Sequence, residues 1–183
     1  MNLPAARQLM HEWVQSPALR HHMDTVAACM GAYAAKLDPS NAERWTIAGL
    51  LHDFDYERHP TPEEHPTVGV AHLRTFGVDE EILHAILGHA AERTGVTRTT
   101  PMDKALFAVD ELAGFIVACA KVRPNGLTDL EARSVKKKLK DKAFAAAVSR
   151  EDIAVGGAEL GALTGMDDTA HIQFCIDAIA RMA

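Results

Sequence analysis

The chain has few aromatic residues and few cysteines, and both features limit the classes of protein and the cellular compartments that we consider. Aromatic residues make up 5% of the 183 residues, and Cys29, Cys119 and Cys175 are scattered without a CxxC spacing. Such cysteines are typical of small buried side chains in a reducing compartment, not of a disulfide framework or a thiolate metal site. No apolar run is long enough to cross a bilayer, and Met1–Pro4 does not resemble the start of a signal peptide. We therefore expect a cytoplasmic protein that has no membrane partner.

Segments that alternate Val, Ile or Thr with polar residues are also absent, while strong helix formers dominate. The predicted helices cover approximately residues 4–14, 18–37, 41–54, 66–76, 79–91, 102–121, 128–146, 150–161 and 168–182. Ser40 and Glu43 have the spacing of a capping box. Gly156-Gly157 is interpreted as a turn, because it lacks the strand and helix that flank a phosphate-binding loop. The sequence predicts an all-α fold.

The charge and length limit the possible partners and the number of domains. The net charge of −6 disfavours general binding to a nucleic-acid backbone. No repeat or long linker divides the 183 residues, so we expect a single domain over residues 1–183.

The most informative segment is the apolar run Trp45–Leu51, which ends directly at His52-Asp53. An unpartnered carboxylate at the end of such a helix would cost several kcal/mol or become protonated. The chain holds 10 histidines, a high count from which partners can come.

Helical geometry identifies which of these polar side chains face the core. Successive helical residues turn by about 100°. His22 therefore shares an apolar stripe with Val26, His89 continues the stripe of Ile86, and Asp110 lies on the apolar face of its helix. A lone inward histidine is more often a hydrogen-bonded core residue than a ligand, and Asp110 alone could anchor two helices. Several such residues on separate helices together predict a metal centre.

A fifth histidine is expected between the third and fourth predicted helices. His65 lies where the loop turns into the helix that begins near Pro66. His72 shares roughly its helical face and His59 lies in the same connection, so either could replace it.

The order of these residues resembles the HD superfamily of metal-dependent phosphohydrolases. The resemblance covers roughly residues 17–121, leaving C-terminal helices over 128–182 to pack on that part. Leu50-Leu51-His52-Asp53 has the usual apolar lead-in, and Glu64–Gly69 and Ile86–His89 are similar to the extra histidine motifs of two-metal members. The whole pattern is similar to that of bacterial hydrolases of symmetrical dinucleoside tetraphosphates, and more narrowly to a group of small HD-domain hydrolases.

The resemblance implies one or two divalent transition metal ions (Fe, Mn, Co, Ni or Zn), bound by nitrogen and carboxylate ligands. The implied metal ligands are His22, His52, Asp53, His65, His89 and Asp110. His22, His52, Asp53 and Asp110 would hold a first ion, and Asp53 would bridge to a second ion on His65 and His89. His52 and Asp53 would be the catalytic residues.

A phosphate-bearing substrate also needs cations at the rim of its pocket. The candidates are Arg20, Arg58, Lys104 and Lys136. Lys136 belongs to the dense run Lys136–Lys140, for which a solvated helix face is an equally good interpretation.

These features together predict a metal-dependent phosphohydrolase. It would act on a nucleotide or another small phosphate ester through a metal-activated hydroxide. Two alternatives stay open: an HD-type di-iron oxygenase, which uses the same ligand set, and a nucleotide-binding HD module without catalytic activity.

Overall fold

The computed structural model describes residues 1–182, and within them the chain forms helices and no strands. The helices are α1 (Leu3–Trp13), α2 (Pro17–Leu37), η1 (Pro39–Asn41), α3 (Ala42–Leu51), α4 (Thr67–Thr75), α5 (Glu80–His89), α6 (Ala91–Thr94), α7 (Pro101–Lys121), α8 (Ala132–Leu139), α9 (Arg150–Thr164) and α10 (Asp168–Ala180). The predicted all-α fold is confirmed. None of the helices in this part of the chain is both long and apolar enough to span a membrane.

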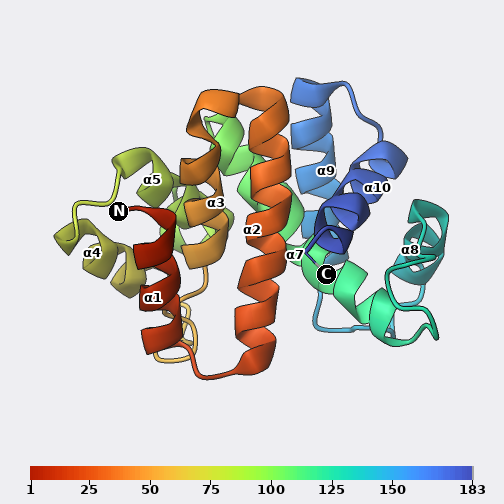
Figure 1. Cartoon of the computed structure of the whole chain (residues 1–183), viewed down its shortest axis with the longest axis horizontal. Coiled ribbons are helices and arrows are strands. Elements are labelled where there is room, and N and C mark those ends of the chain that lie inside the picture. Colours follow the sequence, from red (N-terminus) through yellow and green to blue (C-terminus); the bar gives the residue numbers. More distant parts are fainter. Residues whose placement is uncertain (183) are drawn as a thin grey trace.

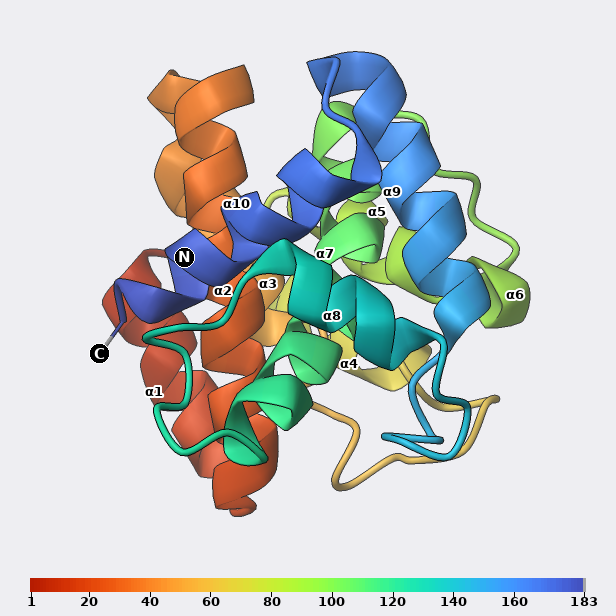
Figure 2. The ribbon, with the colours of Figure 1, turned by 90° about the vertical axis from the view of Figure 1, so that its right-hand side faces the viewer.

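Two long helices, α2 and α7, run through the centre of the molecule (Figure 1). Helices α1, α3, α4 and α5 lie on one side of them, and α8, α9 and α10 lie on the other (Figures 1 and 2). Helix α2 packs against α3 and α7, and α5 packs against both α3 and α7. Helices α2, α3, α5 and α7 therefore form one connected group, and they carry or directly precede most of the sequence-predicted histidines and aspartates. The limits of a domain over the whole chain stay a prediction.

The start of α7 shows how local sequence fixes the placement of this central helix. Pro101 occupies its first turn, where a missing N–H is tolerated. Thr100 and Asp103 cap it reciprocally, each side chain accepting a backbone N–H from the other residue. With its first residue fixed, the apolar stripe of α7, which includes Leu106 and Val109, enters the core.

The structure corrects the helix predicted over 128–146, because only Ala132–Leu139 is helical as α8. The Asp141 carboxylate accepts the backbone N–H groups of Ala143 and Phe144, which favours a turn over a helix. The guanidinium of Arg150 donates to the carbonyl oxygens of Phe144 and Ala145, so these groups find partners outside a helical ladder.

Two further local predictions are wrong, both because of tertiary contacts. Gly156-Gly157 lies inside α9, where a Cβ on Gly156 would approach the Ala108 Cα to 2.6 Å. The glycine therefore allows α9 to approach α7 closely. Ser40 and Glu43 do not form a capping box, since the Glu43 carboxylate instead accepts the backbone N–H of Leu3 at 2.8 Å.

Candidate metal centre

His52 and Asp53 follow α3 directly, and Asp53 lines a cavity of about 690 Å³. The His52 side chain is fully buried. Its Nδ1 lies 2.8 Å from the carbonyl oxygen of Gly49, a pure acceptor, so Nδ1 carries the proton. The neutral ring therefore presents the lone pair of Nε2 toward the cavity side.

Helices α2 and α7 bring His22 and Asp110 to the same place. The His22 Nε2 lies 3.0 Å from Asp110 Oδ1 and 3.3 Å from His52 Nε2. The same Asp110 oxygen lies 3.3 Å from His52 Nε2. One carboxylate oxygen and two imidazole nitrogens thus converge from three helical segments.

A buried carboxylate binds the His65 ring at Nδ1, on the side away from Asp53. Its Nδ1 lies 2.8 Å from Asp55 Oδ1, and the other Asp55 oxygen accepts the backbone N–H of Gly69 at 2.7 Å. A Cβ on Gly69 would come within 2.6 Å of the Asp55 carboxylate, so this contact needs glycine. Asp55 therefore fixes the ring orientation of His65 and leaves its Nε2 facing Asp53.

His89 ends α5 and follows the same pattern. Its Nδ1 donates to the carbonyl oxygen of Ile86, one turn earlier in the helix. His52, His65 and His89 therefore all use Nδ1 for a protein acceptor and leave Nε2 free for the cavity. Such outer hydrogen bonds are usual for histidines that bind metals.

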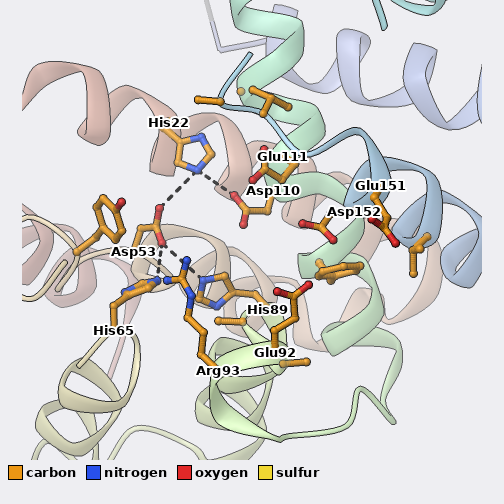
Figure 3. Close-up of a pocket in the computed structure, with 18 of the residues that line it drawn as sticks. His22, Asp53, His65, His89, Glu92, Arg93, Asp110, Glu111, Glu151 and Asp152 are labelled. Carbon is orange, nitrogen blue, oxygen red and sulfur yellow. Dashed lines mark hydrogen bonds and ion pairs between the residues drawn. The ribbon is translucent and has the colours of Figure 1, made fainter. Parts of the chain in front are cut away.

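The two oxygens of Asp53 face two different sets of histidines. Figure 3 shows His22 on one side of Asp53 and His65 and His89 on the other. Oδ2 lies 3.5 Å from the Nε2 of His52 and 3.8 Å from that of His22. Oδ1 lies 3.2 Å from the Nε2 of His65 and 3.6 Å from that of His89. Two groups could each hold an ion, His22–His52–Asp53 and Asp53–His65–His89, with Asp53 common to both.

The charges of these neighbouring groups strongly shift one another's pKa values. Burial disfavours the charged ring of His52, but the carboxylates of Asp53 and Asp110 outweigh it and raise its pKa well above the usual value. Burial likewise opposes ionisation of Asp53, yet His52, together with His65 and His89, outweighs burial and holds the Asp53 pKa well below its usual range. Burial also acts against charged His65, while Asp53 and Asp55 raise its pKa to about 9. The carboxylates thus strongly favour a positive charge among the rings.

The donor set fits a divalent transition metal ion. With Nδ1 hydrogen-bonded to the protein, each ring turns Nε2 toward carboxylate oxygens, and the facing lone pairs repel unless a proton or a metal cation lies between them. Imidazole nitrogen and carboxylate oxygen without thiolate suit Fe, Mn, Co, Ni or Zn. The geometry brings His22, His52, Asp53, His65, His89 and Asp110 together.

The alternative histidines lie elsewhere. His59 Nδ1 pairs with the Glu64 carboxylate at 3.3 Å, and the His72 ring packs on Trp13 with centroids 4.5 Å apart. Of the three histidines in this region, His65 alone lines the cavity.

The structure corrects the expectation that the four predicted cations lie at the cavity rim, since its lining contains none of Arg20, Arg58, Lys104 and Lys136. The guanidiniums of Arg20 and Arg58 donate to carbonyl oxygens at the C-terminal end of α1, where a helix favours positive charge. Lys136 donates to Thr169 Oγ1 on α10.

Other charged residues line the cavity that the sequence did not single out. They are Glu92, Arg93, Arg98, Glu111, Glu151 and Asp152. Arg98 is already engaged, since it forms an ion pair with Glu159 at 2.8 Å and lies over the Phe107 ring. No spacing rule links residues 92, 111 and 151, because tertiary packing alone brings α6, α7 and α9 to one cavity.

Glu111 is the most perturbed of the acids on this wall. Burial, helped by the charge of neighbouring Asp110, raises the pKa of Glu111 to about 7. One of its oxygens accepts the backbone N–H of Ser149 at 3.1 Å, which ties α7 to the start of α9.

Comparison with known proteins identifies the family. Neither a curated protein nor a solved structure matches this chain significantly. The sequence profile described as the HD domain matches residues 19–114, which is more than half of the 183 residues. That range includes every side chain that converges on Asp53. The chain therefore belongs to the HD domain family, whose all-α members bind divalent metal ions and generally act as metal-dependent hydrolases.

Proposed function

We propose that this protein is a metal-dependent phosphohydrolase that cleaves a small phosphate ester, such as a nucleotide. The observation that carries the proposal is the placement of Asp53, whose two oxygens face two separate sets of imidazole nitrogens. In this proposal His22, His52, Asp53 and Asp110 hold one ion, and Asp53, His65 and His89 hold a second. Ions bound in this way lower the pKa of water and offset negative charge on a phosphoryl group.

The protein's own contribution is to hold its donors in one orientation before substrate arrives. His52 and His89 are fixed by backbone carbonyl oxygens of their own helices, and His65 is fixed by Asp55. Because these partners accept hydrogen bonds at Nδ1, each Nε2 stays unprotonated in the neutral ring. The site thus needs little reorganisation during the reaction, which is the main source of electrostatic catalysis.

The charges around the cavity indicate what kind of phosphate ester fits. Arg93 lines it, and no carboxylate in residues 1–182 lies within 4.0 Å of its guanidinium. Glu92, its neighbour in α6, also lines the cavity, and Glu151 and Asp152 line it from α9 (Figure 3). A long polyphosphate would be repelled there. A monophosphate whose other end offers hydroxyl or amino donors, as a nucleoside does, would be favoured.

The test compares metal content and phosphate release in wild type and Asp53→Ala. We expect about two ions per chain in wild-type protein purified without chelator, by plasma mass spectrometry, and release of phosphate from a panel of nucleoside monophosphates. Asp53→Ala should lose both the bound metal and the release of phosphate, while keeping the circular dichroism spectrum of a helical protein. Asp177→Ala is a matched control, because Asp177 is an exposed acid on α10.

Several outcomes would contradict the proposal. Full phosphate release by Asp53→Ala would remove Asp53 from the reaction. Turnover that requires oxygen and stops under anaerobic conditions would indicate the di-iron oxygenase. Nucleotide binding that is unaffected by Asp53→Ala, without turnover in either protein, would indicate a binding module.

A further inference from the structure

A second cavity of about 690 Å³ lies on the opposite side of α9, between α8, α9 and α10. These three helices lie on one face of the molecule (Figure 2). We propose that this cavity binds a free single-chain fatty carboxylate, with its alkyl chain inside and its carboxylate at the rim. The proposal does not depend on the metal centre.

The interior of the cavity is apolar. Leu139, Ile153 and Ile172 contribute side chains from each of the three helices, and Ile153 and Ile172 are buried. A volume of this size lies within the range of about 300–1,000 Å³ that is usual for small-molecule pockets. An alkyl chain would gain affinity there by leaving water.

The polar group nearest the floor already has its partners. His171 is buried, and its Nδ1 lies 2.6 Å from the Tyr33 hydroxyl while its Nε2 lies 3.3 Å from the Ala108 carbonyl oxygen. Burial lowers the pKa of His171, which keeps the ring neutral. The floor therefore offers no unpaired charge to a polar ligand and suits a hydrocarbon chain.

The rim has the opposite character. The basic residues that line the cavity are Arg133, Lys136, Lys137, Lys140 and Arg150. Asp168 is the one acidic residue in that lining. Within residues 1–182, no carboxylate oxygen lies within 4.0 Å of the ammonium groups of Lys136, Lys137 or Lys140. Three uncompensated lysines on a chain of net charge −6 mark this rim as a place for an anion.

An apolar interior beneath a basic rim is complementary to a ligand that has an apolar chain and an anionic headgroup. A free inorganic anion would use the rim and leave the apolar walls in contact with water. A neutral hydrocarbon would leave the lysines without a counter-charge. A fatty carboxylate satisfies both parts, since its headgroup can accept from Lys136, whose present partner is the neutral Thr169 hydroxyl.

Helix α9 separates this cavity from the metal centre. Ile153, Ala154 and Gly157 line the second cavity, whereas Asp152 and Val155 line the first. Binding in the second cavity should therefore persist when the metal centre is disabled. This independence also makes the two proposals separately testable.

Calorimetric titration with octanoate, decanoate and dodecanoate, below their micelle concentrations, tests the proposal directly. We expect the affinity to rise about fourfold for each added methylene that enters the cavity. Butyrate, which lacks the chain, and decyltrimethylammonium, which has the opposite charge, should not bind. Equal affinity for the anionic and cationic ligands, or an affinity that does not change with chain length, would overturn the proposal.

Variants then assign the binding to this cavity. Lys136→Glu with Lys140→Glu should weaken decanoate binding by about tenfold or more, because two rim charges are reversed. Lys36→Glu, an exposed change on α2, is the matched control and should leave it unaffected. Ala154→Trp should abolish binding by filling the cavity, and folding should tolerate it because Ala154 is exposed on α9.

Other occupants would give different results. Binding to phosphatidylglycerol vesicles without binding to free decanoate would replace the proposal with a membrane contact. A dimer in solution that Ala154→Trp dissociates would show that a second copy covers the cavity. Unchanged decanoate affinity in Asp53→Ala is expected, and its loss there would place the ligand in the metal cavity instead.

Discussion

Replacing Asp55 with asparagine should separate the two halves of the proposed metal centre. Asp55 is buried and uses both oxygens, one for His65 Nδ1 at 2.8 Å and one for the Gly69 N–H at 2.7 Å. An asparagine of the same shape has one oxygen, so it can accept only one of these two hydrogen bonds. Its amide N–H₂ would then face another donor, and a buried donor without an acceptor costs about 1–3 kcal/mol.

The loss should fall on the ion that His65 is proposed to hold. Removing an outer partner of a metal-binding histidine typically lowers metal affinity by about 10–100-fold. His22, His52 and Asp110 do not contact Asp55, so the other group should keep its ion. We therefore expect Asp55→Asn to retain about one ion per chain against about two in wild type, in competition with a chelator of known affinity.

Asp103→Ala is the control for the loss of stability itself. Asp103 is also a buried carboxylate, and its Oδ2 accepts the backbone N–H groups of Thr99 and Thr100, but the residue does not line the cavity at Asp53, and alanine removes both hydrogen bonds. Both variants should unfold at lower temperature, and only Asp55→Asn should lose metal. Two ions held with wild-type affinity by Asp55→Asn would refute the claim that Asp55 orients a metal ligand.

Three further predictions concern other parts of the structure. Gly156→Ala should destabilise the protein by about 1–3 kcal/mol in urea unfolding, since the added methyl group would clash with Ala108 where α9 packs on α7. Unchanged stability would contradict that close packing. Burial lowers the pKa of His171, so the folded protein keeps this ring neutral while the unfolded chain protonates it below about pH 6.5. The contribution of His171 to folding stability is therefore present above that pH and is lost as the pH falls. The decrease in urea midpoint between pH 7 and pH 5 should be smaller in His171→Leu than in wild type. Arg93→Ala should raise KM for a phosphate ester about tenfold and leave metal content unchanged, because Arg93 is exposed and forms no ion pair within 4.0 Å with the proposed ligands. An unchanged KM would remove Arg93 from substrate binding.

The convergence of His and Asp side chains on Asp53 could be anticipated in part, because the apolar periodicity of each helix predicts which of its side chains face the core. His22 and Asp110 lie on apolar faces of long helices, so packing those faces inward brings their side chains inward as well. The choice of His65 over His72 and His59 needed the tertiary structure. It depends on Asp55, which accepts from His65 across a loop whose conformation the sequence pattern does not determine.

The surroundings of the site could not be anticipated in the same way. Arg20 and Arg58 lie close to the motif residues in the sequence, but their guanidiniums donate to carbonyl oxygens at the C-terminal end of α1. Glu151 reaches the cavity only because α9 packs closely on α7 at Gly156. Long cationic side chains find partners by three-dimensional proximity, and a contact between helices so far apart in sequence has no local signal.

The charge state of the proposed metal centre follows from the same geometry. Asp53 and Asp110 together raise the pKa of His52, and Asp53 with Asp55 raises that of His65. In the absence of metal, these rings therefore hold protons near neutral pH, and an incoming ion must displace them. The carboxylates that attract the ion also attract its competitor, the proton. Metal affinity should consequently fall as the pH is lowered through the pKa of about 9 for His65, and Asp55, which raises that pKa, thereby sets how strongly protons compete for the second group.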